Sequence, residues 1–181
     1  MTTLTVFEED QAARPILQTA DGNEIARLLK GAGVRFERWR ADQALPPGAT
    51  QDQVLAAYKA SVDRLNAECG YQAADVISLT PDHPDKAVLR QKFLSEHIHS
   101  EDEVRFFVEG SGTFYMHVGG KVHMLLCEKG DLIGVPANAR HWFDMGPTPR
   151  FTCIRLFTNP AGWVAQYTGD AIADRFPRMA A

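Results

Sequence analysis

The chain has 181 residues, of which 45% are hydrophobic and 23% are charged, and its formal net charge is −4. This length predicts one domain, and this composition excludes a disordered or membrane-spanning chain. Because the basic residues are scattered along an acidic chain, we expect a small-molecule partner and no nucleic acid.

Three cysteines, Cys69, Cys127 and Cys153, lie far apart in the sequence. An odd number at such spacing is typical of reduced thiols rather than of a disulfide framework. No segment has the pattern of a secretion signal or of a membrane span. We therefore expect a cytoplasmic protein, and nothing in the sequence requires more than a monomer.

The first half of the chain mixes helix and strand. Residues 21–31 begin with an Asp21 cap and carry leucines at helical spacing, which predicts a short helix. Residues 34–39 alternate like a strand. Apolar residues then repeat every three or four positions over 51–68, which predicts one longer helix.

The segment "ADVISLTPDHPD", which begins at Ala74, predicts a strand that runs into a loop broken by prolines. His83 and its flanking aspartates lie in this loop. A solvated loop is the better interpretation of this cluster than a metal site.

From about Phe93 to Thr158 short β-rich runs alternate with turn signals, which predicts an antiparallel barrel or sandwich. The "GGK" turn at 119–121 should join two of these runs as a hairpin. The fold class is therefore mainly β (α+β). We expect a single domain over 1–181, with a core barrel at about 72–158, a mixed α/β extension with packed helices at 1–71, and a tail at 159–181.

The stretch "SEHIHSEDEVRFFVEG" places many polar and charged side chains, whose burial is costly, among aromatic residues. His97 and His99 are two apart in a strand and so face one side. Glu103 can reach the same ion only if the chain turns at 100–102 and returns on the neighbouring strand. Two imidazoles and one carboxylate are ligands that suit iron(II) and similar ions.

A fourth ligand is available in "GDLIGVPANARHWFDMG". In its last strand His141 and Phe143 should share one face, with Trp142 on the other. Taken singly, each histidine has an ordinary structural interpretation. Together, three histidines and one glutamate predict an octahedral site with two open positions for a bidentate substrate.

The spacing of these residues resembles the cupin signature. Gly110 follows Glu103 at the spacing of the first cupin motif. The spacing of Gly130, Pro136 and His141 is that of the second motif. Asn138 and Met145 stand where the second motif has glycine and asparagine. The resemblance implies a cupin-type antiparallel β-barrel.

Within the cupins, residues 93–116 and 130–146 are similar to the acireductone dioxygenase family of methionine salvage. The resemblance implies one Fe(II) or Ni(II) ion per chain, held by His97, His99, Glu103 and His141. It also implies that the enzyme cleaves 1,2-dihydroxy-5-(methylthio)pent-1-en-3-one with O2. In this family the iron form gives 2-oxo-4-methylthiobutanoate and formate, and the nickel form gives 3-(methylthio)propanoate, formate and carbon monoxide.

Two arginines are candidates for binding an anionic substrate. Arg105 shares a face with Glu103, and an interior guanidinium is costly unless an anion accompanies it. Arg155 has a similar position in its strand. The alternative for both is a salt bridge to a nearby acid, Glu96, Asp102 or Glu109.

Other roles are predicted by proximity to the ligands. Glu96 or Asp102 could be the catalytic base, or could hold an imidazole N–H. An apolar wall for the substrate's thioether tail would use Phe93, Phe107, Phe143 and Trp163, although aromatic residues in a barrel are often plain core.

Two other functions remain open from the residues. A cupin with these ligands could be a metal-dependent isomerase that needs no O2, or a non-catalytic module that binds a small ligand. A non-catalytic module that acts as a regulator would need a DNA-binding partner protein, because residues 1–90 contain no basic recognition helix.

Overall fold

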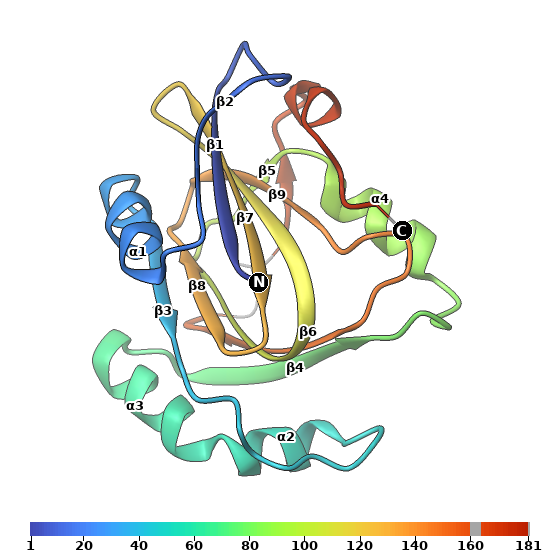
Figure 1. Cartoon of the computed structure of the whole chain (residues 1–181). Coiled ribbons are helices and arrows are strands. Elements are labelled where there is room, and N and C mark those ends of the chain that lie inside the picture. The colour runs from blue at the N-terminus through green and yellow to red at the C-terminus, as the bar shows by residue number, and fades with distance from the viewer. Residues whose placement is uncertain (160–163, 181) are drawn as a thin grey trace.

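The computed structural model describes residues 1–159 and 164–180 as two sheets that share one long strand, with helices outside them (Figure 1). The strands are β1 (Thr3–Glu8), β2 (Pro15–Thr19), β3 (Arg35–Arg38), β4 (Ala73–Leu79), β5 (His97–Ile98), β6 (Glu103–Val118), β7 (Lys121–Glu128), β8 (Asp131–Val135), β9 (Arg140–Asp144), β10 (Phe151–Phe157) and β11 (Gln166–Tyr167). The helices are α1 (Gly22–Gly31), α2 (Gln51–Ala57), α3 (Lys59–Cys69) and α4 (Lys86–Leu94), followed by a 3-10 turn at Ile172–Arg175.

The shared strand β6 joins the two sheets. One sheet has the order β11-β5-β9-β6-β7-β1-β2, and in the other β6 lies between β8 and β10, with β3 and β4 at the edges. Gly110 lies where β6 changes sheets, with φ +72°, and a Cβ atom there would come 1.8 Å from the carbonyl oxygen of Arg150. Only glycine fits this bend. All strand pairs within residues 1–159 and 164–180 are antiparallel, which confirms the predicted mainly β class.

The apolar core lies between the two sheets. Side chains that alternate along the strands, including Phe107, Phe114 and Leu125, are fully buried there. Helix α1 covers one side of this core and inserts Ile25 and Leu29. The predicted helix over 21–31 and the hairpin between β6 and β7 are both present.

Helices α2 and α3 lie against the outer side of the second sheet, beside β4 (Figure 1). The prediction of one helix over 51–68 was wrong, because the helix is interrupted at Tyr58. The Tyr58 ring packs edge-on against Phe106, with ring centroids 5.4 Å apart. The backbone there leaves helical geometry (φ −109°, ψ 18°), and the ring lies in a second apolar cluster between these helices and the second sheet.

Two further differences from the predicted layout concern where the barrel strands begin. Residues 86–94 form α4, so the β-rich run does not begin at Phe93, and its first strand is the short β5. In addition, β1 pairs with β7 and β3 pairs with β8, so strands of the barrel come from before residue 72. The alternation of apolar residues within one strand could not reveal either pairing, because both pairings join distant parts of the chain.

The last described segment covers the outer side of the first sheet. Phe176 contacts Trp142 and Phe7, with ring centroids 6.0 and 5.5 Å apart. No helix in the described part of the chain is long and apolar enough to cross a bilayer.

Candidate metal centre

Three strands bring the four predicted ligands together inside the barrel. His97 lies in β5 directly opposite His141 in β9, and His99 follows β5 by one residue. The ring centroids of His97 lie 5.0 Å from those of His99 and 4.5 Å from those of His141. Glu103 begins β6. All four side chains, called the ligand group below, are buried.

Glu103 reaches the histidines by a different route from the one predicted. It does not lie on a strand that neighbours β5, because β5 pairs with β9 and β11. The beginning of β6 pairs instead with β8 and β10. The turn at 100–102 therefore carries the chain from one sheet to the other, and the carboxylate approaches the imidazoles across the barrel interior.

The distances within the ligand group are those of a set that could share one ion. Oε2 of Glu103 lies 2.9 Å from Nε2 of His141 and 3.1 Å from Nε2 of His99. One ligand atom from each residue lies within 4.8 Å of all the others. Ligand atoms bound about 2.1 Å from a common ion are separated by at most about 4.2 Å, so small side-chain shifts suffice.

The backbone orients two of the imidazoles. Nδ1–H of His97 donates to the carbonyl of Ser95 at 2.7 Å, and Nδ1–H of His141 donates to that of Ala139 at 2.8 Å. With Nδ1 bonded to the backbone, Nε2 is the ring nitrogen that remains to face an ion. A metal-binding histidine usually makes such a hydrogen bond through its other ring nitrogen. The residues present therefore fit a divalent cation.

The charge states of the group also suit a cation. Burial, with the nearby His141 ring, lowers the pKa of His97 to about 4, so this imidazole is neutral at pH 7. Burial alone raises the pKa of a carboxyl group, but the Arg105 charge and hydrogen bonds from His141 and His99 hold the pKa of Glu103 well below its usual range. The group thus offers a neutral nitrogen and an ionised oxygen.

Arg105 lies beside the ligand group. Its Nε donates to Oε1 of Glu103 at 2.7 Å, the oxygen that does not face the histidines. Its guanidinium carbon lies 4.9, 5.4 and 5.9 Å from the ring centroids of Phe143, Phe114 and Phe93. A cation that is buried between a carboxylate and aromatic faces is held in one place.

The predicted aromatic wall is brought together in part. Phe93 from α4 contacts Phe143 from β9, with ring centroids 6.2 Å apart, and both rings contact Arg105. Phe107 instead packs against Phe151 in the apolar core. Trp163 lies outside the described residues.

Glu96 directly precedes β5 and faces away from the ligand group, because neighbouring side chains of an extended segment point to opposite sides. Its side chain is fully buried, and its two oxygens accept hydrogen bonds from His117 Nδ1 at 2.6 Å and Thr168 Oγ1 at 2.7 Å. The opposite side of the His117 ring contacts Glu9 at 2.8 Å. Both carboxylate oxygens are thus engaged outside the barrel interior.

Asp102 and Arg155 also have partners that the sequence did not indicate. Asp102 accepts a hydrogen bond from the backbone N–H of Ala137 at 2.9 Å, in the loop that precedes β9. Arg155 donates from Nε to Asp75 at 2.7 Å, an acid other than Glu96, Asp102 and Glu109. Asp75 lies opposite Arg155 on β4, a pairing between distant segments.

Sequence reasoning missed the ion pair of Arg90 with the buried Asp144. Nε and Nη2 of Arg90 donate to the two carboxylate oxygens of Asp144, at 2.8 and 3.0 Å. The available signal was Asp144, a charged residue directly after the apolar pair Trp142 and Phe143. Its partner could not be found while residues 86–94 were interpreted without a helix.

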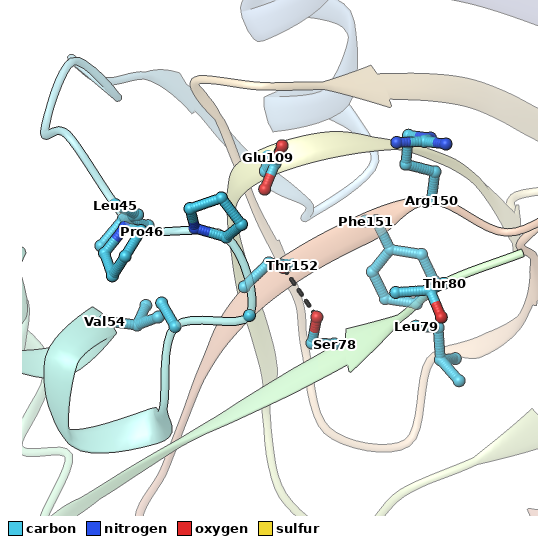
Figure 2. A pocket seen from close by; sticks show the side chains of 13 residues that line it. Leu45, Pro46, Val54, Ser78, Leu79, Thr80, Glu109, Arg150, Phe151 and Thr152 are labelled. Atoms are coloured by element: carbon cyan, nitrogen blue, oxygen red, sulfur yellow. Dashed lines mark hydrogen bonds between the residues drawn. The ribbon is translucent and has the colours of Figure 1, made fainter. Parts of the chain in front are cut away.

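A separate hollow of about 340 Å³ lies between the loop at 45–49 and the strands β4 and β10 (Figure 2). The hydroxyl groups of Ser78 and Thr152 are 2.9 Å apart in it, and Glu109 and Arg150 also line it. No member of the ligand group lines this hollow.

Known proteins resemble this chain along nearly its whole length. The acireductone dioxygenase of Hahella chejuensis is 57% identical over 179 residues, which cover 99% of this chain and 96% of that protein. That of a Synechococcus strain is 58% identical over 180 residues, which cover 99% of each. The solved structure of acireductone dioxygenase from Bacillus anthracis, with a cadmium ion in its active center, gives a TM-score of 0.81 at 32% identity, covering 92% of this chain and 98% of that one. A model of the ARD/ARD′ family matches residues 3–165, and with these relatives it shows that the chain belongs to the ARD/ARD′ family.

Proposed function

We propose that this chain is an acireductone dioxygenase that cleaves 1,2-dihydroxy-5-(methylthio)pent-1-en-3-one with O2 in methionine salvage. The observation that carries the proposal is the buried ligand group, whose four ligand atoms all lie within 4.8 Å of one another. Membership of the ARD/ARD′ family over residues 3–165 supports the same reaction. The partners are therefore a small organic substrate and O2.

A single metal ion fits the site, and we propose that His97, His99, Glu103 and His141 hold Fe(II) or Ni(II). Three imidazole nitrogens and one carboxylate oxygen are compatible with both ions. When bound, the ion supplies Lewis acidity and two adjacent positions for the two substrate oxygens. The products would follow the ion, as the family resemblance implies.

Arg105 would bind and orient the anionic enediolate. Its hydrogen bond to Glu103 ties the guanidinium to a ligand, at 2.7 Å, and the aromatic rings around it exclude water. A charge-assisted hydrogen bond from such a fixed group is stronger than one in water. Arg155, which is paired with Asp75, is the weaker candidate for this role.

The apolar tail of the substrate would lie against Phe93 and Phe143. These two rings already contact Arg105 and each other, so a molecule held by Arg105 would extend its tail along them. We keep Trp163 as a further member of this wall. Phe107 is better explained as core, because it is fully buried and packs against Phe151, whereas Phe143 contacts Phe93 and Arg105 as well as the core.

Of the two acids considered as the base, Asp102 is the better candidate. Both oxygens of Glu96 are bonded to His117 and Thr168 on the other side of the strand. Removing a substrate proton would require Glu96 to break one of these bonds. Asp102 is exposed and directly precedes Glu103.

The function is tested with protein stripped of metal and reloaded with Fe(II) or Ni(II). We expect O2 uptake with acireductone in both forms, formate in both, and carbon monoxide only with nickel. Conversion of the substrate without O2 uptake would instead support an isomerase. Binding of the enediol with no turnover would support a non-catalytic module.

A further inference from the structure

Asp144 is a buried carboxylate that connects three separate segments. It ends β9, its side chain is 0% exposed, and it accepts four hydrogen bonds. Arg90 supplies two, and the backbone N–H groups of Gly146 and Met179 supply the others at 2.8 and 2.9 Å. Such full pairing makes a buried ion pair specific in its geometry.

Arg90 completes the connection from the side of α4. Its Nη2 also donates to the carbonyl of Met179 at 3.1 Å, and its side chain is 19% exposed. Figure 1 shows the C-terminal segment running beside α4, near β9. We call Arg90, Asp144 and the backbone of Met179 the latch.

The latch lies next to the aromatic contact that faces the candidate site. Arg90 and Phe93 are three residues apart on α4 and so lie near each other on the helix surface. Asp144 directly follows Phe143 on β9. Helix α4 therefore meets β9 through two adjacent contacts, one ionic and one between the rings of Phe93 and Phe143, whose centroids are 6.2 Å apart.

We propose that the latch is a positioning device for substrate specificity: it fixes α4 on β9 so that Phe93 stays at one distance from Arg105 and the ligand group. Arg90 and Asp144 do not touch the substrate in this arrangement. They act through Phe93, whose ring centroid lies 5.9 Å from the guanidinium carbon of Arg105. The inference rests on the proposed function, because it assigns this wall to the apolar tail of the acireductone.

The first test compares Arg90→Met with Arg90→Lys in metal-loaded protein. Methionine keeps an unbranched, flexible stem, shorter than that of arginine, and removes the charge, whereas lysine keeps the charge and loses the two-pronged geometry. Substrates are acireductones with the methylthioethyl tail and with a shorter alkyl tail. For Arg90→Met we expect the ratio of their kcat/KM values to fall about tenfold, mainly through KM for the longer tail, as for the loss of one well-packed apolar contact.

Metal content should remain one ion per chain in both variants, because the latch does not contact the ligand group. Arg90→Lys should give an intermediate ratio. If the melting temperature falls while the ratio of kcat/KM values stays that of the unchanged protein, the pair is only structural and the proposal is wrong.

A second pair of variants tests the latch without altering the ion pair. Met179→Pro removes the backbone N–H that donates a hydrogen bond to Asp144. Met179→Ala keeps this N–H but, like the proline variant, removes the contacts of the methionine side chain. We expect the proline variant alone to lower the ratio. Equal ratios in the two variants would count against the latch.

Amide hydrogen exchange separates this inference from the proposed function. Arg90→Met and Met179→Pro should accelerate exchange over residues 86–94 and leave β6 and β7 unchanged. Absence of O2 uptake by the unchanged protein would overturn the proposed function. Unchanged exchange in α4 would overturn the latch, whatever the activity.

Discussion

Arg105 and Glu103 are two residues apart on β6 and are joined by a hydrogen bond of 2.7 Å between Nε and Oε1. The other oxygen of the same carboxylate faces His99 and His141. One glutamate therefore connects the ligand group with the cation proposed to bind substrate. This arrangement keeps Glu103 ionised and the guanidinium in place.

Replacement of Arg105 should separate metal binding from turnover. In Arg105→Ala we expect metal content to persist and turnover of acireductone to fall by about 10²–10³-fold. This is the usual cost of losing one preorganised hydrogen-bond donor. Arg105→Lys should recover part of the loss. Metal analysis and O2 uptake are measured on the same samples, and unchanged turnover would remove Arg105 from the site.

His141 should be required for metal affinity, and His83 should not. Calorimetric titration of metal-free protein with Ni(II) should give one site per chain. In His141→Ala the affinity should fall at least about 100-fold, because loss even of a supporting group costs about 10–100-fold. His83 lies in the loop before α4, where it accepts a bond from the N–H of Asp85 at 3.1 Å, and His83→Ala is the matched control. Equal affinities in the two variants would refute the ligand role of His141.

His117 should make stability depend on pH. Burial alone lowers its pKa, but hydrogen bonds to Glu9 and Glu96 raise the pKa above the ordinary 6.5. A raised pKa in the folded state means that the protonated ring stabilises the protein fully below pH 6.5 and that this contribution is lost as pH rises through the folded-state pKa.

The free energy of unfolding is therefore compared between the unchanged protein and His117→Gln from pH 5.5 to 9. We expect the difference to be largest at the acid end and to shrink toward the alkaline end. Glu9→Gln, which changes the more exposed of the two carboxylate partners, should show the same trend with smaller amplitude. A difference that does not vary with pH would contradict the assigned ion pair.

Gly110 and Gly48 form a matched pair for testing the bend in β6. Both have positive φ, +72° and +70°, but a Cβ at Gly110 would collide with Arg150 and one at Gly48 meets open space. Gly48→Ala should cost about 1–2 kcal/mol of unfolding free energy from backbone strain alone. Gly110→Ala should cost at least about 3 kcal/mol, because overpacking adds to that strain. Chemical denaturation measures both, and similar losses would show that the close approach to Arg150 is easily relieved.

Much of the fold and of the site could be predicted from the sequence by itself, because the signals were local. The cap at Asp21, the hairpin turn before Lys121 and the alternation of β6 and β7 depend on residues near each other in the chain. The same holds for His97 and His99, since a spacing of two in a strand places both side chains on one face. His141 and Phe143 were assigned to one face for the same reason.

Only the tertiary structure decided which distant groups meet. The approach of Glu103 across the barrel, the pairing of Arg155 with Asp75, and the burial of Glu96 against His117 each join segments without a local signal. The break at Tyr58 and the helix α4 depend in the same way on packing against other elements. Local periodicity reports which side of an element is apolar, whereas the partner of a buried charge is set by strand pairing and by the cost of leaving that charge unpaired.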